Sequence, residues 1–297
     1  MRRIGWVVAA SLLASLVLPF DRPAQAAAAV RPPKLQDASD LKPRYRAIAR
    51  GVGYWSGSLY TAAGPVRIQV VKVDLKYADV APVVARRGDG GFGLERTSSM
   101  SRRERAIAGI NGSFFSPRNR VPMDLLVVNG RFVTQPARRP ALVVRQDGTA
   151  SIVPARKARE EAALNAIGGG PTLLSNGKMS LAGWPRNMGG RAPRTAAGLT
   201  WDGKVLMVTI DGRSRASAGA TIREEARYLA ALGARDAINL DGGGSSTMVV
   251  HGRVVNRPSD GSERAVSNGL MVFPRHTYVM RPMPRRSPYS GIHFSRS

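Results

Sequence analysis

The stretch AINLDGGGSSTM, residues 237–248, passes from an apolar run to one carboxylate and then to bare backbone. Residues 237–240 are typical of a buried strand, with Asp241 at its end. The three consecutive glycines 242–244 are costly for the backbone and indicate positive φ or a very close approach to another group. Hydroxyl residues 245–247 add donors suited to an oxyanion, a phosphate or a sugar. We interpret this loop as a binding or catalytic site; the alternative is a glycine-rich hairpin turn capped by an aspartate.

A helix is predicted immediately before this stretch, over residues 221 to about 232. Thr221 and Glu224 form a capping-box pattern, and Gly233 stands where a left-handed residue ends many helices. Apolar residues between them share one face, so we expect the helix to pack on the sheet and to fix the strand before the glycines. A weaker helical run, residues 98–107, also precedes a short apolar segment.

Turn signals recur between apolar runs along the rest of the chain. Most are Asn-Gly or Asp-Gly pairs, the strongest local signals for a β-hairpin. We therefore expect an α+β domain with a mixed, largely antiparallel sheet, hairpins and covering helices. The turn pairs are Asn129-Gly130, Asp147-Gly148, Asn176-Gly177, Asp202-Gly203 and His251-Gly252.

Residues 1–26 have the pattern of a secretory signal peptide: two arginines, an apolar run broken by Pro19, and a small-residue triplet. We expect cleavage after Ala26 and a secreted or periplasmic protein, with an uncleaved N-terminal anchor as the alternative. After the signal peptide, we predict an extended leader over residues 27–52, one domain over residues 53–274 and a basic C-terminal tail over residues 275–297.

The chain is strongly basic, with a formal net charge of +25 at pH 7. Loss of residues 1–26 removes three arginines and one aspartate, which leaves +23. The excess is either a solvated arginine surface or a field for anionic partners: phosphoglycans, small sugar phosphodiesters or, weakly, anionic envelope surfaces. No nucleic-acid motif is present, so we expect no nucleic-acid partner. The absence of cysteine excludes disulfides and thiolate chemistry, and three widely spaced histidines argue against zinc.

Further polar residues stand at strand ends or in turns. Asn111 opens the segment NGSFF, which either holds a sugar ring or turns between two core phenylalanines. Arg194 and Thr195 begin a predicted strand, and arginine offers a planar fork for phosphate, although a lone arginine is more often solvated. Asp211 follows another apolar run. The turn NRPSDGSER, residues 256–264, is either a salt-bridged loop or the source of a second acid or base, and it contains Asp260, Glu263 and Arg264.

The ordered motifs INGSFF, GGGPTLL, RTAAG, DGR, INLDGGGSSTM and NRPSDGSERAVSNGLMVF resemble those of the phosphodiester glycosidase family. The resemblance covers about residues 80–274, and the LDGGGSSTM and PSDGSER blocks are its most specific parts. It implies a single glycosidase domain and an exported hydrolase that cleaves a glycosyl-1-phosphodiester on a glycan or envelope polymer, as expected of exopolysaccharide-related bacterial members.

Hydrolysis at the anomeric carbon needs a carboxylate for the oxocarbenium-like centre or its attacking water, and a clamp for the departing phosphate. Asp241 is our first choice for acid, base or nucleophile, with Glu263 as its partner and Asp211 in reserve. The predicted substrate-binding residues are Asn111, Arg194, Thr195, Gly242, Gly243, Gly244, Ser245, Ser246, Asp260 and Arg264.

Two other classes of protein compete with this hypothesis. A non-catalytic module for anionic envelope polysaccharide would use the same basic surface. A serine hydrolase would need a nucleophile elbow, and no G-x-S-x-G motif occurs in the sequence. We expect no cofactor; calcium held by carboxylates and carbonyls is conceivable, although no EF-hand spacing is present.

Overall fold

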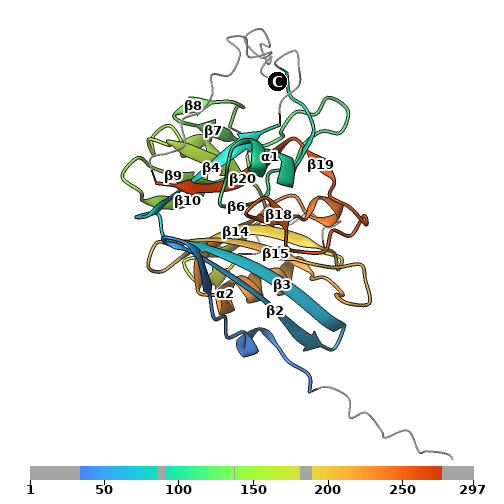
Figure 1. Cartoon of the computed structure of the whole chain (residues 1–297). Coiled ribbons are helices and arrows are strands. Elements are labelled where there is room, and N and C mark those ends of the chain that lie inside the picture. Colours follow the sequence, from blue (N-terminus) through green and yellow to red (C-terminus); the bar gives the residue numbers. More distant parts are fainter. Residues whose placement is uncertain (1–33, 86–90, 137, 181–188, 276–297) are drawn as a thin grey trace, which may run out of the picture. The chain divides into compact units, whose positions relative to one another are not determined.

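The computed structural model describes residues 34–85, 91–136, 138–180 and 189–275 (Figure 1). The predicted signal peptide lies outside the described residues, as does the basic tail apart from Arg275. Every strand pairing in the described part of the chain is antiparallel. The predicted antiparallel character is therefore confirmed, whereas the parallel component of a mixed sheet is not found there.

The largest sheet has eight strands in the order β1-β2-β3-β15-β14-β16-β12-β13. Its long hairpin, β2 with β3, forms one side of the sheet in Figure 1. The bounds are β1 Arg46–Ala49, β2 Val52–Thr61, β3 Gly64–Val73, β15 Val205–Ile210, β14 Arg194–Thr200, β16 Ala234–Asn239, β12 Thr172–Ser175 and β13 Lys178–Met179.

Two five-stranded sheets and one short strand pair complete the described strands. The first five-stranded sheet comprises, in spatial order, β10 Ala150–Pro154, β9 Pro140–Val144, β11 Asn165–Gly168, β7 Leu126–Val128 and β8 Arg131–Phe132. The second comprises β18 Arg253–Val254, β17 Met248–Val250, β6 Ala108–Asn111, β20 Asn268–Pro274 and β4 Ala78–Val84. The short pair is β19 Ala265–Val266 with β5 Glu95–Arg96.

The central strands β14 and β15 of the eight-stranded sheet are buried on both faces. Successive side chains of a strand point to opposite sides and so enter two different cores. In β15, Val205 and Met207 enter a central core that also contains residues of both five-stranded sheets. Leu206 and Val208 point the other way, into a second core beneath α2 (Ile222–Ala231). The strands that lead to the candidate site are thus held between two layers of packed side chains.

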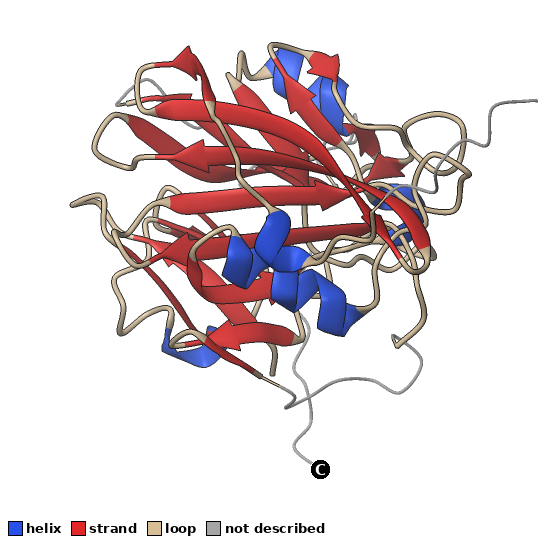
Figure 2. Cartoon of the chain, turned by 90° about the horizontal axis from the view of Figure 1, so that it is seen from below, coloured by secondary structure: helices blue, strands red, loops and turns tan. Residues whose placement is uncertain are grey.

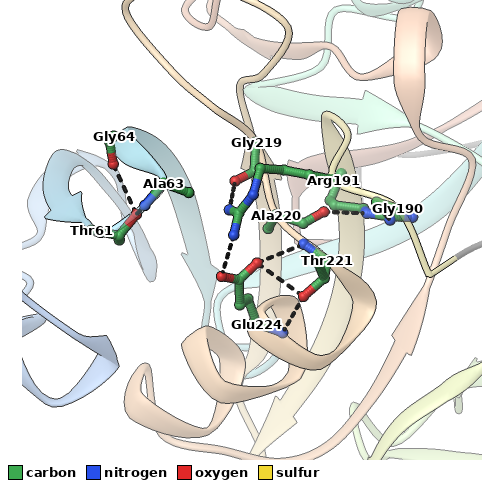
Figure 3. A network of polar contacts seen from close by, with 10 residues as sticks. Thr61, Ala63, Gly64, Gly190, Arg191, Gly219, Ala220, Thr221 and Glu224 are labelled. Atoms are coloured by element: carbon green, nitrogen blue, oxygen red, sulfur yellow. Dashed lines mark hydrogen bonds and ion pairs between the residues drawn. The ribbon is translucent and has the colours of Figure 1, made fainter.

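Helix α2 begins with the capping box that the sequence predicts. The Thr221 hydroxyl accepts a hydrogen bond from the Glu224 backbone N–H, and the Glu224 carboxylate accepts one from the Thr221 N–H. Arg191 donates to Glu224 and to the Gly219 carbonyl, which ties the segment before β14 to the start of the helix (Figure 3). The helix packs on β12 and β16, as expected, and lies across the strands in Figure 2.

The five predicted turns each join an antiparallel pair of strands. At Asn129, Asn176 and His251 the residue before the glycine also has positive φ, at 48°, 49° and 48°. Positive φ at both central residues is the type I′ pattern, whose twist matches that of the flanking strands. Local sequence therefore determines these hairpins.

Helices contribute less than the predicted α+β architecture requires. The described residues contain two α-helices, α2 and the seven-residue α1 (Thr97–Arg103). Helix α2 packs on the eight-stranded sheet, and α1 packs on the second five-stranded sheet and on β5. Helix α1 ends before the predicted limit at residue 107 because the chain turns at Arg105, where φ is 55°. The described part of the domain is therefore sheet-rich, and it also contains three short 3-10 turns: η1 Ala38–Asp40, η2 Ala155–Lys157 and η4 Gly243–Ser245.

The folded domain begins earlier than predicted. The expected extended leader reaches residue 52, yet β1 pairs with β2 at the edge of the eight-stranded sheet. Leu41 is buried in the core beneath α2, so the chain is already part of the fold there. The strand β1 is short and lies at the sheet edge, where Arg46 and Ala47 are exposed. Its sequence therefore lacks the alternation of polar and apolar residues that predicts a strand. Among the described residues, none of the helices has the length and apolarity needed to cross a membrane.

Candidate active site

The loop after β16 passes from the eight-stranded sheet to β17 in the second five-stranded sheet. The Leu240 N–H donates to the Thr195 carbonyl over 2.7 Å, and the Asp241 N–H donates to the Gly112 carbonyl over 3.1 Å. Gly243 then has φ of 61°, a left-handed conformation that glycine adopts without strain. The prediction of a strand, a carboxylate and a special glycine turn matches the described backbone.

Asn111, at the end of β6, fixes both ends of this loop. Its side-chain amide donates to the Asp241 carbonyl over 2.6 Å. Its oxygen accepts from the Thr247 N–H over 3.0 Å and from the Thr195 hydroxyl over 2.9 Å. The Thr195 hydroxyl also lies 3.2 Å from Ser246 Oγ. Asn111, Thr195 and Ser246 are all buried, so the structure places these three predicted substrate-binding residues beneath the loop as its support.

Asp241 is largely buried, and burial raises the pKa of its carboxyl to about 6. The Ser245 hydroxyl and the Arg264 guanidinium act in the opposite direction because they favour the charged carboxylate. Ser245 Oγ is itself buried without a hydrogen bond of normal geometry to any described residue, so its effect on Asp241 is that of a nearby dipole. A carboxyl with a pKa near neutrality can exchange a proton under physiological conditions.

Gly244 is packed against an ion pair from the turn at residues 256–264. Arg264 donates to Asp260 through Nη2 over 2.6 Å and through Nε over 3.0 Å. A Cβ added at Gly244 would lie 2.5 Å from Asp260 Cγ and would also overlap Arg264 Nη2. The absence of a side chain at Gly244 therefore allows the Asp260–Arg264 ion pair to approach the backbone beside Asp241.

A second cation lies against the neighbouring glycine. A Cβ added at Gly243 would be 3.4 Å from Nη2 of Arg213, whose side chain is exposed. Gly242 approaches the chain elsewhere, because its added Cβ would lie 3.0 Å from the Pro193 carbonyl. Two arginines thus flank the glycine loop, an arrangement suited to the oxygens of an anionic group.

Arg194 does not face this loop. It shares a face of β14 with Ala196, which is packed in the core beneath α2, whereas Thr195 faces the opposite way. The Arg194 guanidinium donates to the Ala220 and Gly190 carbonyls over 2.9 and 2.5 Å. Through these contacts Arg194 anchors the segment that enters α2, and its role as a phosphate clamp stays a prediction.

Asp211, the reserve choice for catalysis, is held in a network of hydrogen bonds. It is 2% exposed, and its carboxylate accepts from Asn256 Nδ2, the Arg257 N–H and Gln69 Nε2 over 3.1, 3.0 and 3.3 Å. Burial raises its pKa against these hydrogen bonds. Asn256 in turn donates to the Ser246 carbonyl and accepts from the Met248 N–H. Asp211 therefore holds the far end of the glycine loop in place through Asn256.

Glu263 is directed to α1 instead of forming a described contact with Asp241. Its carboxylate accepts from the Ser98 backbone N–H over 2.9 Å. Ser98 is in the first turn of α1, where backbone N–H groups have no partner within the helix. The arrangement makes Glu263 a cap of α1 and leaves Arg264, its neighbour in sequence, to reach the loop.

A carboxylate that the sequence reasoning missed acts on Asp241 instead. Asp124 is 1% exposed, forms an ion pair with Arg139 over 3.1 Å, and its negative charge raises the pKa of Asp241. Burial also raises the pKa of Asp124. The Arg139 guanidinium lies 4.8 Å from the centre of the Phe114 ring. The sequence feature that could have predicted it is the position of Asp124, a lone carboxylate at the start of the apolar run LLVV.

No metal centre accompanies these groups in the described ranges, where no three acidic or histidine side chains gather closely enough to hold an ion. The calcium considered from composition therefore has no described ligand set. The site instead presents one proton-exchanging carboxyl, a second carboxylate and flanking arginines around a bare backbone loop. This arrangement defines a sheet-built domain whose loop is suited to an oxygen-rich, anionic ligand.

Comparison with known proteins identifies the family. Residues 104–273 match the model of the phosphodiester glycosidase family, and the chain belongs to that family. It is 30% identical over 196 residues to the SPbeta prophage-derived uncharacterized protein YomE of Bacillus subtilis, covering 62% of this chain and 30% of that protein. It is 25% identical over 259 residues to N-acetylglucosamine-1-phosphodiester alpha-N-acetylglucosaminidase of Bos taurus, covering 77% and 46%.

The fold is similar to that of a solved relative. The zebrafish N-acetylglucosamine-1-phosphodiester alpha-N-acetylglucosaminidase catalytic domain, auto-inhibited by its pro-peptide, superposes with a TM-score of 0.66 at 19% identity. The match covers 79% of this chain and 88% of that one. The chain spans less than half the length of YomE and of the bovine enzyme.

Proposed function

We propose that this protein hydrolyses the bond between an anomeric carbon and phosphate in a glycosyl-1-phosphodiester. The observation that carries the proposal is Asp241, a largely buried carboxyl with a pKa of about 6 at a glycine loop flanked by Arg213 and Arg264. Membership of the phosphodiester glycosidase family supports the same reaction class.

The reaction would follow from the charges around the loop. Water attacks the anomeric carbon, the carbon–oxygen bond to phosphate breaks, and a phosphomonoester leaves with the bonding electrons. Asp241, mostly ionised at pH 7, accepts the proton of the attacking water. Phosphate is a good leaving group without protonation, so Arg264 and Arg213 are needed to stabilise its charge rather than to donate a proton.

Burial is the main cause of the raised pKa of this base, and Asp124 would add a smaller increment. Its negative charge raises the pKa of Asp241, while its own charge is balanced by Arg139. A base with a pKa close to the ambient pH combines a large ionised fraction with useful basicity. Asp124 thus replaces Glu263 as the second carboxylate of the proposed site.

We further propose that the protein is exported and meets its substrate on an envelope or secreted glycan. The N-terminal sequence pattern of residues 1–26 and the strongly basic composition support this proposal.

The decisive experiment uses methyl N-acetylglucosamine-1-phosphate diester in water enriched in oxygen-18. The proposed reaction releases free sugar that carries the label, with unlabelled methyl phosphate. Label in the phosphate would show cleavage at phosphorus and contradict the assignment. Asp241→Asn should abolish label transfer, whereas Asp202→Asn, at an exposed turn, is the matched control. Binding without turnover, across a panel of sugar diesters, would favour a non-catalytic binding module.

A further inference from the structure

A cavity of about 550 Å³ lies where β10 and β9 of one five-stranded sheet meet β12 and β16 of the eight-stranded sheet. Part of its wall is apolar and includes Ile152, Pro171 and Leu174. Three arginines also line it: Arg138, Arg139 and Arg156. The cavity therefore combines a surface for a carbon skeleton with a cluster of cations.

The charge in this cavity is not balanced by the protein. Asp236 is the sole acidic residue among its described lining, and it is already paired with Arg235 over 2.6 Å and accepts from the Asn176 N–H. Arg138 and Arg156 are exposed and form no hydrogen bond or ion pair with the rest of the described chain. Two guanidinium groups are therefore available to an anionic ligand.

Arg139 connects this cavity with the candidate active site. Its guanidinium holds Asp124, the carboxylate that raises the pKa of Asp241. Its aliphatic stem faces the cavity, since a Cβ added at Gly170 would lie 3.4 Å from Arg139 Cδ. Arg139 therefore lies between the cavity and the carboxylate that acts on Asp241, and it joins the two sites.

We propose that this cavity binds a further phosphate group of the substrate, so that the protein acts on an oligomer or polymer with repeated phosphodiesters. The inference rests on the proposed function, because it extends the same substrate chain. Arg138 and Arg156 bind the second phosphate as planar forks, and the apolar wall contacts the carbon units between phosphates. Binding of a phosphodiester chain then depends on the positions of Arg138 and Arg156 in addition to the net positive charge of the protein.

The test measures binding of an oligomer of three glycerol units joined by two phosphodiesters, which has no anomeric bond to cleave. Calorimetry at fixed salt compares wild type with the double variant Arg138→Gln/Arg156→Gln. The control is Arg44→Gln/Arg46→Gln, which removes the same charge from exposed positions in and just before β1 at the opposite edge of the eight-stranded sheet. We expect the first variant to lose about tenfold or more in affinity and the control to change little, because charge-assisted hydrogen bonds require placement.

Three results would overturn the inference. Unchanged affinity in the cavity variant would show that the arginines do not bind the chain. Equal losses in both variants would show attraction by the overall field. Inorganic phosphate that binds as tightly as the oligomer, with the same dependence on Arg138 and Arg156, would show a site for free phosphate instead.

Kinetics separate this inference from the proposed function. On a sugar diester with a single phosphate, the cavity variant should retain the wild-type rate, whereas its KM for a sugar linked to a longer phosphodiester chain should rise about tenfold. If wild type cleaves no sugar diester, the proposed reaction fails even where oligomer binding depends on the cavity. If cleavage proceeds with equal KM values for both substrates in both proteins, the cavity inference fails alone.

Discussion

Gly244→Ala tests whether Arg264 acts at the loop. The added methyl group would lie 2.5 Å from Asp260 Cγ, roughly 1 Å inside normal van der Waals contact, and would also overlap the guanidinium of Arg264. Both side chains end in flexible, partly exposed groups, with side-chain exposures of 37% and 45%, so they can move away from the methyl group. The ion pair should therefore break or shift while the backbone of the loop stays.

The expected loss of stability is small. A partly exposed ion pair contributes about 0–1 kcal/mol, and 1 kcal/mol lowers the Tm of a domain of this size by about 2–4 °C. The catalytic loss should be much larger, roughly a hundredfold in kcat/KM, because a charge that stabilises the departing phosphate is displaced. The acid limb of the pH profile should also move to higher pH, because Arg264 normally lowers the pKa of Asp241.

The assay is kcat/KM on the methyl sugar phosphodiester from pH 4.5 to 8, with Tm measured on the same preparations. Gly190→Ala is the control, since its added Cβ meets no atom within 4 Å and its φ is not in the left-handed region. A kcat/KM within twofold of wild type and an unmoved acid limb would refute the role of Arg264. A fall in Tm of well over 10 °C would instead mean that the loop itself had been disrupted.

Three further predictions concern the buried carboxyls. Asp241→Asn should reduce kcat by about a hundredfold or more with little change in Tm, measured on the same substrate, and a variant with wild-type kcat would remove Asp241 from the mechanism. Wild-type kcat/KM should rise with pH through about 6 as Asp241 ionises. Asp124→Asn should shift that rise to lower pH, because Asp124 raises the pKa of Asp241. A shift to higher pH would contradict the assigned effect of Asp124 on Asp241. Glu225, fully buried in α2 without a described hydrogen-bond partner, has its pKa raised by burial from 4.5 to about 8. Between those values the folded state retains a proton that the unfolded state releases, so stability should fall as pH rises from about 4.5 to 8; Glu225→Gln should flatten the plot of Tm against pH, and an unaltered slope would count against this account.

Local chemistry made part of this molecule predictable. The Asn-Gly and Asp-Gly turns determine hairpins through the φ values of two residues, and the capping box at Thr221 specifies where α2 starts. The exposed edge strand Arg46–Ala49 lacks such a signal, because half of its side chains face solvent and it depends on pairing with β2. Its place in the sheet is therefore a tertiary property.

The site was less predictable because its groups are joined through packing. Arg194 and Thr195 are adjacent in sequence, yet strand alternation directs one to α2 and the other to Asn111. In the loop before β19, Glu263 contacts α1 whereas Arg264 reaches the glycine loop. Asp124 approaches Asp241 only through the arrangement of separate sheets, which no spacing in the chain encodes. Residue type identified the kind of chemistry, and register decided which residues take part.

Asn111 bonds both ends of the glycine loop, so the loop cannot be moved to another protein by itself. A graft of residues 237–248 into another scaffold would transfer Asp241 without the Asn111 amide that holds its backbone, because that amide comes from a strand more than a hundred positions earlier. The strand that carries Asn111 and the glycine loop therefore depend on each other, although they are far apart in the sequence. Chimeras of two related proteins should be active when both segments come from the same parent. They should be inactive when the crossover combines an Asn111 strand and a glycine loop that do not fit each other.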